Sequence, residues 1–427
     1  MKDGSVKLVK TKDPDALKND RDVMTVEQNR VVVATDLDQV KGRNTEAQEV
    51  TGNQVTDMQY GDTMVKAPEA WDKLKSENTE TVRVAVIDSG IDPTHPDLEG
   101  KVLPGTTIIN ENASGNKYAD DGKDDHGHGT HVAGIIAATI NNNFGINGIS
   151  GNVDVELLPV KVLNDSGSGS TYDVVEGIKY AADHGASILN MSLGSNSWSA
   201  IEADAVRYAQ NKGCLIIAAA GNDSIDVADE YPASYDGVIS VGSVTATEER
   251  SYFSNYGETL DVSAPGSSIV STIPKKIAME QRAQGAAVYG DDKEGYYISW
   301  SGTSMATPHV VGVAALYKAL HPEVTGADIG SLLMSTARDV GNVGKDIETG
   351  SGIVDANAML GGEVTKVPLK VTAPKGGTEL YEEVTLSAMV NPTMDIRTLK
   401  YYLDTESDDN LVSTVDCSDG GMYYDCK

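Results

Sequence analysis

Between residues 82 and 360 the chain alternates short, strongly apolar runs with longer stretches in which apolar residues recur at helical spacing. The apolar runs are rich in β-branched residues, which is typical of strands buried on both faces. They are Val82–Ile87, Val155–Val162, Ile188–Met191, Leu215–Ala219 and Val238–Val241. The predicted helices are Tyr172–His184, Ala200–Lys212, Thr307–Leu320 and Gly326–Thr336. This order predicts an α/β fold in which a mostly parallel sheet is covered by helices on both faces.

The two ends of the chain follow other patterns. Asp22–Val33 has the composition of a β-strand, and residues 34–57 are rich in Asp, Gln, Asn, Thr and Gly, as linkers are. After Gly362, apolar and polar residues alternate in short runs between turn residues. This predicts a small antiparallel β module, immunoglobulin-like and incomplete. We therefore divide the chain into a first segment at 1–35, a linker at 36–59, a main domain at 60–362 and the β module at 363–427.

The net charge of the chain limits the kinds of molecule that it is expected to bind. The 427 residues include 34 basic and 64 acidic side chains, a net charge of −30, which argues against a nucleic-acid partner because phosphate binding needs positive surface. Such a charge suits a secreted protein and calcium sites. No apolar run approaches the roughly 20 residues of a membrane span. We expect a monomer that is secreted or held at the cell surface, and because Met1–Ser5 is polar we expect the natural start upstream.

The three cysteines point to no catalytic thiol. Cys214 lies in the apolar run that ends at Ala220 and is expected in the core. Cys417 and Cys426 are close enough in sequence to close a small disulfide loop or to remain as thiols, and the sequence leaves both open.

Three polar segments stand out against this pattern, in the order Asp88, His128, Ser304. A serine hydroxyl needs a base within hydrogen-bond reach, and that base needs a carboxylate to fix its tautomer. Asp88 ends the first strong strand, at the sheet edge where sites form. Taken singly, Asp88 is equally a turn residue and Ser304 a helix cap. Their common order favours a catalytic set.

The histidine segment contains His126, His128 and His131, which raises the question of a metal. The segment lacks the His-Glu-x-x-His spacing of a helical zinc site, so a base is the preferred interpretation. We expect His131 to pack beneath the apolar helix that it begins, and His126 to be a surface neighbour.

Together the three segments resemble the signature motifs of the subtilisin-like serine proteases, the subtilases, over roughly residues 60–360. The resemblance implies that Ser304 is the nucleophile, His128 the general base and Asp88 its orienting carboxylate. The segment that ends at Asn222 resembles the one that supplies the family's oxyanion asparagine. The implied reaction is acyl transfer from a peptide to the serine, followed by hydrolysis.

The resemblance also implies a groove for an extended peptide, bound by strand addition. One wall would hold Ser192, Leu193 and Gly194, and the facing wall Gly167. Asp223 and Glu230 match positions that line the pocket for P1, the residue before the cleaved bond. Two carboxylates there would favour Lys or Arg at P1. The alternative is that they are two solvated acids on a very acidic protein.

Calcium is the implied cofactor. Asp97 and Asn142 match the family's strong calcium site, where the backbone carbonyls of Ile140, Phe144 and Ile146 would complete an oxygen cage. A further ligand of the family falls near Thr56 here, which is a departure. The acidic run from Asp120 to Asp125 is either a second cation site or a solvated loop.

Two segments flank this machinery. Val26–Asn29 resembles the end of a subtilase propeptide, which implies a zymogen whose first segment is an inhibitor and folding template. Self-cleavage would then fall between Thr35 and Thr56. About twenty extra residues, Lys275–Gly295, precede the serine motif and would form a flap or a maturation loop.

We therefore predict a calcium-binding, extracellular serine endopeptidase that acts on proteins or peptides. Two alternatives stay open. The chain is a dedicated processing protease with one partner substrate, or an inactive homologue that binds through its β module.

Overall fold

The computed structural model describes residues 7–9, 17–18, 23–35, 55–111, 115–342 and 344–361. Beyond these it describes the backbone of five strands: β14 (Leu369–Ala373), β15 (Leu386–Val390), β16 (Thr398–Tyr402), β17 (Leu411–Asp416) and β18 (Tyr423–Cys426). The predicted pairing of Cys417 with Cys426 lies outside the described side chains. Cys214 is a buried free thiol, as predicted.

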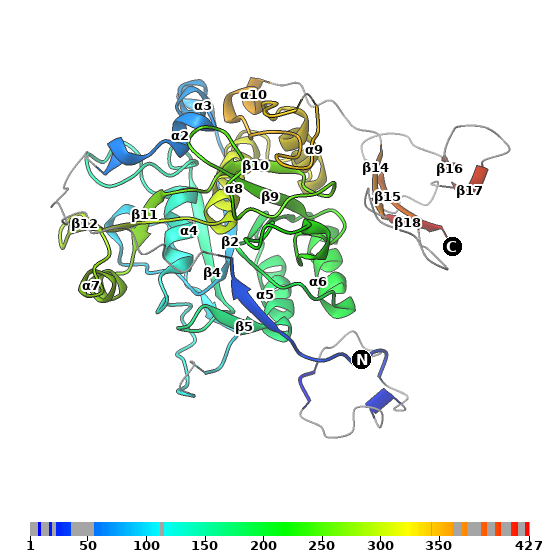
Figure 1. Cartoon of the computed structure of the whole chain (residues 1–427), viewed down its shortest axis with the longest axis horizontal. Helices are drawn as coiled ribbons and strands as arrows, with labels where there is room; N and C mark the ends of the chain where they lie inside the picture. The colour runs from blue at the N-terminus through cyan, green and yellow to red at the C-terminus, as the bar shows by residue number, and fades with distance from the viewer. Residues whose placement is uncertain are drawn as a thin grey trace.

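The centre of the molecule is a sheet of seven strands in the order β10-β9-β8-β6-β2-β4-β3, and every neighbouring pair is parallel (Figure 1). Its strands are β2 (Val82–Asp88), β3 (Thr106–Thr107), β4 (Val155–Lys161), β6 (Ile188–Met191), β8 (Leu215–Ala219), β9 (Ile239–Val244) and β10 (Val262–Pro265). The predicted parallel α/β fold is confirmed.

Alternate side chains of β2 enter two different cores, one on each face of the sheet. Val84 and Val86 pack with the helices α4 (His128–Ala137) and α8 (Thr303–Leu320). Ala85 and Ile87 pack with α5 (Thr171–Asp183) on the opposite face. The remaining helices are α2 (Gly61–Met64), α3 (Ala67–Leu74), α6 (Ala200–Asn211), α7 (Lys275–Ala283), α9 (Gly326–Ser335) and α10 (Ala356–Gly361). Within the described residues, no helix is both long and apolar enough to cross a bilayer.

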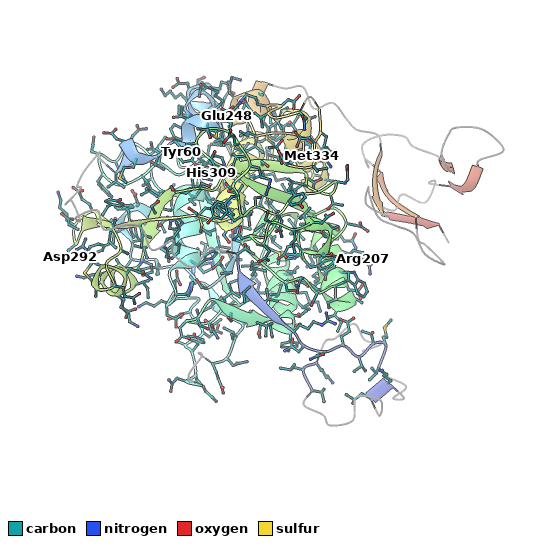
Figure 2. The ribbon with its side chains drawn as sticks, viewed as in Figure 1. Tyr60, Arg207, Glu248, Asp292, His309 and Met334 are labelled. Carbon is teal, nitrogen blue, oxygen red and sulfur yellow. The ribbon has the colours of Figure 1, made fainter. Side chains whose placement is uncertain are left out.

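Smaller antiparallel sheets surround this core. The extra segment before the serine motif forms α7 and then β12 (Val288–Asp291), which pairs with β13 (Gly295–Trp300), while β13 also pairs with β11 (Ile269–Ile273). Asp292, at the tip of this hairpin and at the rim of the molecule in Figure 2, pairs with Lys275 at 2.7 Å. The C-terminal strands form one antiparallel sheet, β14-β15-β18, and one antiparallel pair, β16-β17. They agree with a small antiparallel module, and its immunoglobulin-like character stays a prediction.

Two elements differ from the prediction. The long strand expected over Asp22–Val33 is only β1, Val31–Ala34, and residues 23–30 pair with no strand. The helix that carries Ser304, α8, begins at Thr303, four residues before the expected start, so that Pro308 lies inside it. Proline has no N–H to donate to the carbonyl of Ser304 one turn earlier. The hydroxyl of Ser192 donates to that carbonyl instead, at 2.9 Å, which makes the early start possible.

Candidate active site

Asp88 and His128 meet because the last residue of β2 lies beside the first residue of α4. Nδ1 of His128 is 2.8 and 2.9 Å from the two carboxylate oxygens of Asp88, and both side chains are fully buried. The N–H of Ser89 donates to Asp88 Oδ1 at 2.6 Å. A carboxylate that accepts from Nδ1 leaves Nε2 as the basic nitrogen.

Asp124 holds the first turn of α4, and the sequence had not singled it out. One of its oxygens accepts the N–H groups of His126 and Gly127 at 3.0 and 2.8 Å, and the hydroxyl of Ser89 at 2.9 Å. The other accepts the N–H and hydroxyl of Thr130 at 3.0 and 2.6 Å. A buried carboxylate thus satisfies the N–H of Thr130 in the first turn and two N–H groups just before the helix. Its place four residues before His128, in the acidic run, was the available signal.

The extra segment borders the same turn. Gly127 has a φ of 103°, and a Cβ at this position would lie 3.3 Å from side-chain carbons of Ile273 and of Ile277 in α7. The Trp300 ring stacks on His131 with centroids 4.8 Å apart and on His128 at 6.4 Å. His131 is buried as expected, and burial lowers its pKa to about 3, so that it is neutral. Through Ile277 the insert therefore borders the turn that precedes His128.

The predicted walls of the groove enclose an extended strand, and that strand comes from the chain itself. β1 lies between β5 (Ser168–Ser170) and β7 (Leu193–Gly194) and is antiparallel to both (Figure 1). The ladder continues with Ala34 N–H to the Gly167 carbonyl at 3.0 Å and Thr35 N–H to the Ser192 carbonyl at 3.2 Å. Val32 is 1% exposed.

This strand ends at Ser304. The carbonyl oxygen of Thr35 accepts the backbone N–H of Ser304 at 3.2 Å and the side-chain amide of Asn222 at 2.6 Å. Asn222 Oδ1 accepts the N–H and hydroxyl of Thr303 at 2.9 and 3.0 Å, which fixes the direction of its amide. Two such donors on one carbonyl oxygen are the arrangement that stabilises a developing oxyanion.

The two predicted P1-pocket acids lie in different surroundings. Glu230 is 5% exposed, and a Cβ on Gly194 would collide with its carboxylate. In the part of the chain that the structure describes, this carboxylate has no hydrogen bond and no ion pair. Burial, and then the charge of Asp223, raises the pKa of Glu230 to about 8. Asp223 is exposed, and its N–H donates to Asn255 Oδ1 at 3.0 Å.

The predicted calcium ligands also lie together. Asp97 is fully buried, and its two oxygens accept the Asn142 amide at 2.6 Å, the Ile146 N–H at 2.9 Å and the Tyr297 hydroxyl at 3.0 Å. Burial raises the pKa of Asp97 to about 6. Among the described residues no basic side chain forms an ion pair with it.

The loop that carries Asn142 contains a series of left-handed residues. Asn141, Asn143 and Gly145 have φ values of 61°, 69° and 71°, so left-handed residues alternate with the expected ligands at 140, 142, 144 and 146. Thr56, where one family ligand falls, donates its hydroxyl to the Gly145 carbonyl at 2.7 Å. The described residues hold no cluster of three or more His, Cys, Asp or Glu side chains suited to a metal. A site built on one carboxylate and neutral oxygens, as Ca²⁺ accepts, needs no such cluster.

A parallel α/β fold with a buried Asp–His pair, and with a serine at a helix start whose N–H shares a carbonyl acceptor with Asn222, is the pattern of the serine hydrolase class. The model of the subtilase family matches residues 79–352, and the chain belongs to this family. The predicted family and the predicted enzyme class, a subtilisin-like serine endopeptidase, are confirmed.

Characterised relatives share most of this region. Thermitase of Thermoactinomyces vulgaris is 41% identical over 258 residues, which are 60% of this chain and 81% of that protein. Subtilisin DY of Bacillus licheniformis is 38% identical over 304 residues, 70% of this chain and 97% of that protein. A thermophilic serine proteinase of Bacillus sp. (strain AK1) is 43% identical over 258 residues, 60% of this chain and 57% of that protein.

Proposed function

We propose that Ser304, His128 and Asp88 hydrolyse peptide bonds through an acyl-enzyme. Ser304 Oγ adds to the carbonyl carbon while His128 Nε2 takes its proton, and Asp88 stabilises the imidazolium that forms. The oxyanion is held by the Ser304 N–H and Asn222, and His128 returns the proton to the leaving amine. Water then releases the acid by the same steps. The supporting observation is a backbone carbonyl held by both donors at the end of a strand in the groove.

A fluorophosphonate probe and a peptide substrate test this proposal. We expect one label per chain, on Ser304, and loss of both label and hydrolysis in Ser304→Ala. Ser331→Ala, on the surface of α9, is the matched control and should keep both. A folded wild type that has lost residues 1–35 and still takes no label would favour the inactive, binding-type homologue. A label that persists in Ser304→Ala would assign the nucleophile elsewhere.

We propose that residues 1–35 are an inhibitory prosegment and that Thr35–Asp36 is the bond the enzyme cleaves in itself. This bond opens the linker in which maturation was predicted. Outside the groove, Glu27 accepts the Ser199 hydroxyl at 2.6 Å and the Ala200 N–H at 3.1 Å, where α6 begins. Asn29 accepts the Tyr172 N–H at 2.9 Å, where α5 begins. Helix N-termini favour such acceptors.

Inhibition can be tested in trans. A synthetic peptide of residues 1–35 should inhibit the processed enzyme competitively. The same peptide with Ala34→Pro lacks the N–H that donates to Gly167 and should inhibit far more weakly. Equal inhibition by both peptides would contradict strand addition in the groove.

We propose that the enzyme prefers Lys or Arg at P1, because Glu230 is buried without a cation beside it. Peptides that differ only in Lys, Phe or Leu at P1 test the preference, and equal or better cleavage after Phe or Leu would reject it. Cleavage of a peptide library at one extended motif alone would favour a dedicated processing protease over a broad one.

We propose that Ca²⁺ binds at Asp97 and Asn142 with the carbonyls of Ile140, Phe144 and Ile146. Two observations support this site: the buried carboxylate has no ion pair among the described residues, and the loop contains left-handed residues. A bound cation would neutralise Asp97, and at 1,000 times its Kd it would stabilise the fold by about 4 kcal/mol. A chelator should therefore lower Tm in the wild type and much less in Asp97→Asn, and equal shifts would reject the site. Secretion and a monomeric state stay predictions.

A further inference from the structure

The side chain of Thr35 contacts the nucleophile itself. Thr35 Oγ1 lies 2.7 Å from Ser304 Oγ, and Ser304 Oγ lies 2.9 Å from the carbonyl oxygen of Ser192. Ser304 is fully buried and Thr35 is 7% exposed, so water does not compete freely for these bonds. No other hydrogen bond of the Thr35 hydroxyl is recorded within the described ranges.

The directions of these bonds follow from the groups involved. A carbonyl only accepts, so the single proton of the Ser304 hydroxyl points to Ser192. Ser304 Oγ can then only accept from Thr35. The chain runs from the Thr35 hydroxyl to the Ser304 hydroxyl and on to the Ser192 carbonyl.

Ser192 holds the nucleophile from two sides. Its carbonyl accepts from the Ser304 side chain, and its own hydroxyl donates to the Ser304 carbonyl that Pro308 leaves without an N–H. The nucleophile is therefore held to the substrate-binding wall by its side chain and its main chain.

This arrangement opposes the first chemical step. To react, Ser304 must turn its proton from Ser192 to His128 Nε2 and aim a lone pair at the carbonyl carbon of Thr35. The bond from Thr35 uses one lone pair of that oxygen, and the bond to Ser192 uses the proton.

We propose that the Thr35 hydroxyl is a positioning group that turns the nucleophile away from its base and so slows self-cleavage at Thr35–Asp36. The inference rests on the proposed prosegment and names how its removal is regulated. When the hydroxyl swings away, Ser304 Oγ bonds to the Thr35 carbon and its proton passes to His128. The bond to the Asp36 nitrogen then breaks, and that nitrogen receives the proton. Until then the prosegment stays attached and occupies the groove.

The test is the rate of self-cleavage of the full chain after refolding. The product that begins at Asp36 is followed by mass spectrometry in the wild type, Thr35→Val and Thr35→Ser. Valine keeps the shape of threonine and lacks the hydroxyl, so we expect cleavage about fivefold faster, the worth of one ordinary hydrogen bond. Thr35→Ser keeps the hydroxyl and should stay close to the wild-type rate. An unchanged or slower rate in Thr35→Val overturns the proposal.

The three chains distinguish a failure of the proposed Thr35 role from a failure of the proposed peptidase function. Residue 35 is absent from the processed enzyme, so all three chains should yield the same enzyme with the same activity on an added peptide. That activity also reports correct folding. Equal self-cleavage rates together with normal peptide hydrolysis reject only the role of Thr35. Loss of both reactions in the wild type rejects the proposed function.

A second measurement uses matched peptides with Thr or Val at P1 in single turnover. If the hydroxyl acts as proposed, the Thr peptide acylates the enzyme about fivefold more slowly than the Val peptide, and the two peptides bind with equal affinity. Equal acylation rates overturn the proposal, as does a difference that lies wholly in affinity.

Discussion

The groove that holds β1 and the pocket beside it recognise a peptide in different ways. In the groove, β1 is paired on both edges, and Val32 is buried in the core. In the proposed P1 pocket, Glu230 is buried with no partner among the described residues, and the proposed prosegment would present only Thr35 at P1. Backbone pairing accepts almost any extended sequence. A buried carboxylate at the proposed P1 site would favour a basic side chain. Residues 1–35 end in Thr35 and do not supply one.

The difference separates inhibition from turnover. The proposed prosegment would satisfy the groove and thus bind well, yet it would leave Glu230 without a partner and turn Ser304 toward Ser192. A substrate with a basic P1 residue would satisfy both regions. The enzyme's own first segment is, on this account, a tight ligand and a slow substrate.

The largest expected effect is at Asn222, which every substrate would contact through its backbone carbonyl. Asn222→Ala removes one donor to the carbonyl oxygen and should lower kcat by about 10² to 10³ with little change in KM. Because the lost contact is to the backbone, the loss should be equal for Lys and Phe peptides. Asn222→Asp keeps the size of the side chain and should be just as slow. A loss that depends on the P1 residue would contradict the separation of groove and pocket.

The next effect is confined to the pocket. Glu230→Gln keeps the shape and removes the charge that the carboxylate carries above pH 8. In that range kcat/KM for Lys peptides should fall about 10- to 100-fold, the range of a charge-assisted hydrogen bond. Phe peptides should be cleaved as before. Asp223→Asn, at the exposed acid nearby, should change the preference much less. An equal loss for Lys and Phe peptides would make Glu230 structural.

The pH dependence should differ in the same way. Because burial and then Asp223 raise the pKa of Glu230 to about 8, the group is mostly neutral at pH 7 and becomes anionic as the pH rises through 8. The kcat/KM for Lys peptides should therefore keep rising through pH 8, beyond the point at which Phe peptides level off. Superimposable profiles would show that the charge of Glu230 takes no part.

The smallest effect is expected at the far end of the prosegment. Glu27→Ala removes the acceptor at the start of α6 and should weaken binding of the 1–35 peptide about fivefold, the usual worth of a helix cap. Burial, and to a lesser extent Glu27, raises the pKa of Glu202 to about 7. Ionisation of Glu202 then repels Glu27, so affinity should fall as the pH rises through 7. Glu27→Gln should flatten this dependence, and an affinity that rises with pH would contradict it.

The motifs and most of the sheet could be predicted because they depend on local patterns. The strong apolar runs form strands in the structure. Asp88 was predicted at the end of such a run, and His128 was predicted just before an apolar helix. The position of β1 could not be predicted, since its partners at 168–170 and 193–194 lie far along the chain. The role of Asp124 was hidden because a run of acids looks the same whether it is solvated or buried.

The early start of α8 was also beyond sequence reasoning. Pro308 marks the first turn of a helix by the usual rule. Here a hydroxyl from another element compensates for its missing N–H, and only the fold brings Ser192 to that carbonyl.

The central claim is that this serine protease first cleaves itself where Thr35 meets its own nucleophile. The most direct measurement is the N-terminus of the refolded full chain, read by mass spectrometry in the wild type and in Ser304→Ala. We predict a new N-terminus at Asp36 in the wild type and none in the variant. A wild-type N-terminus elsewhere, or the same N-terminus in Ser304→Ala, would contradict the account.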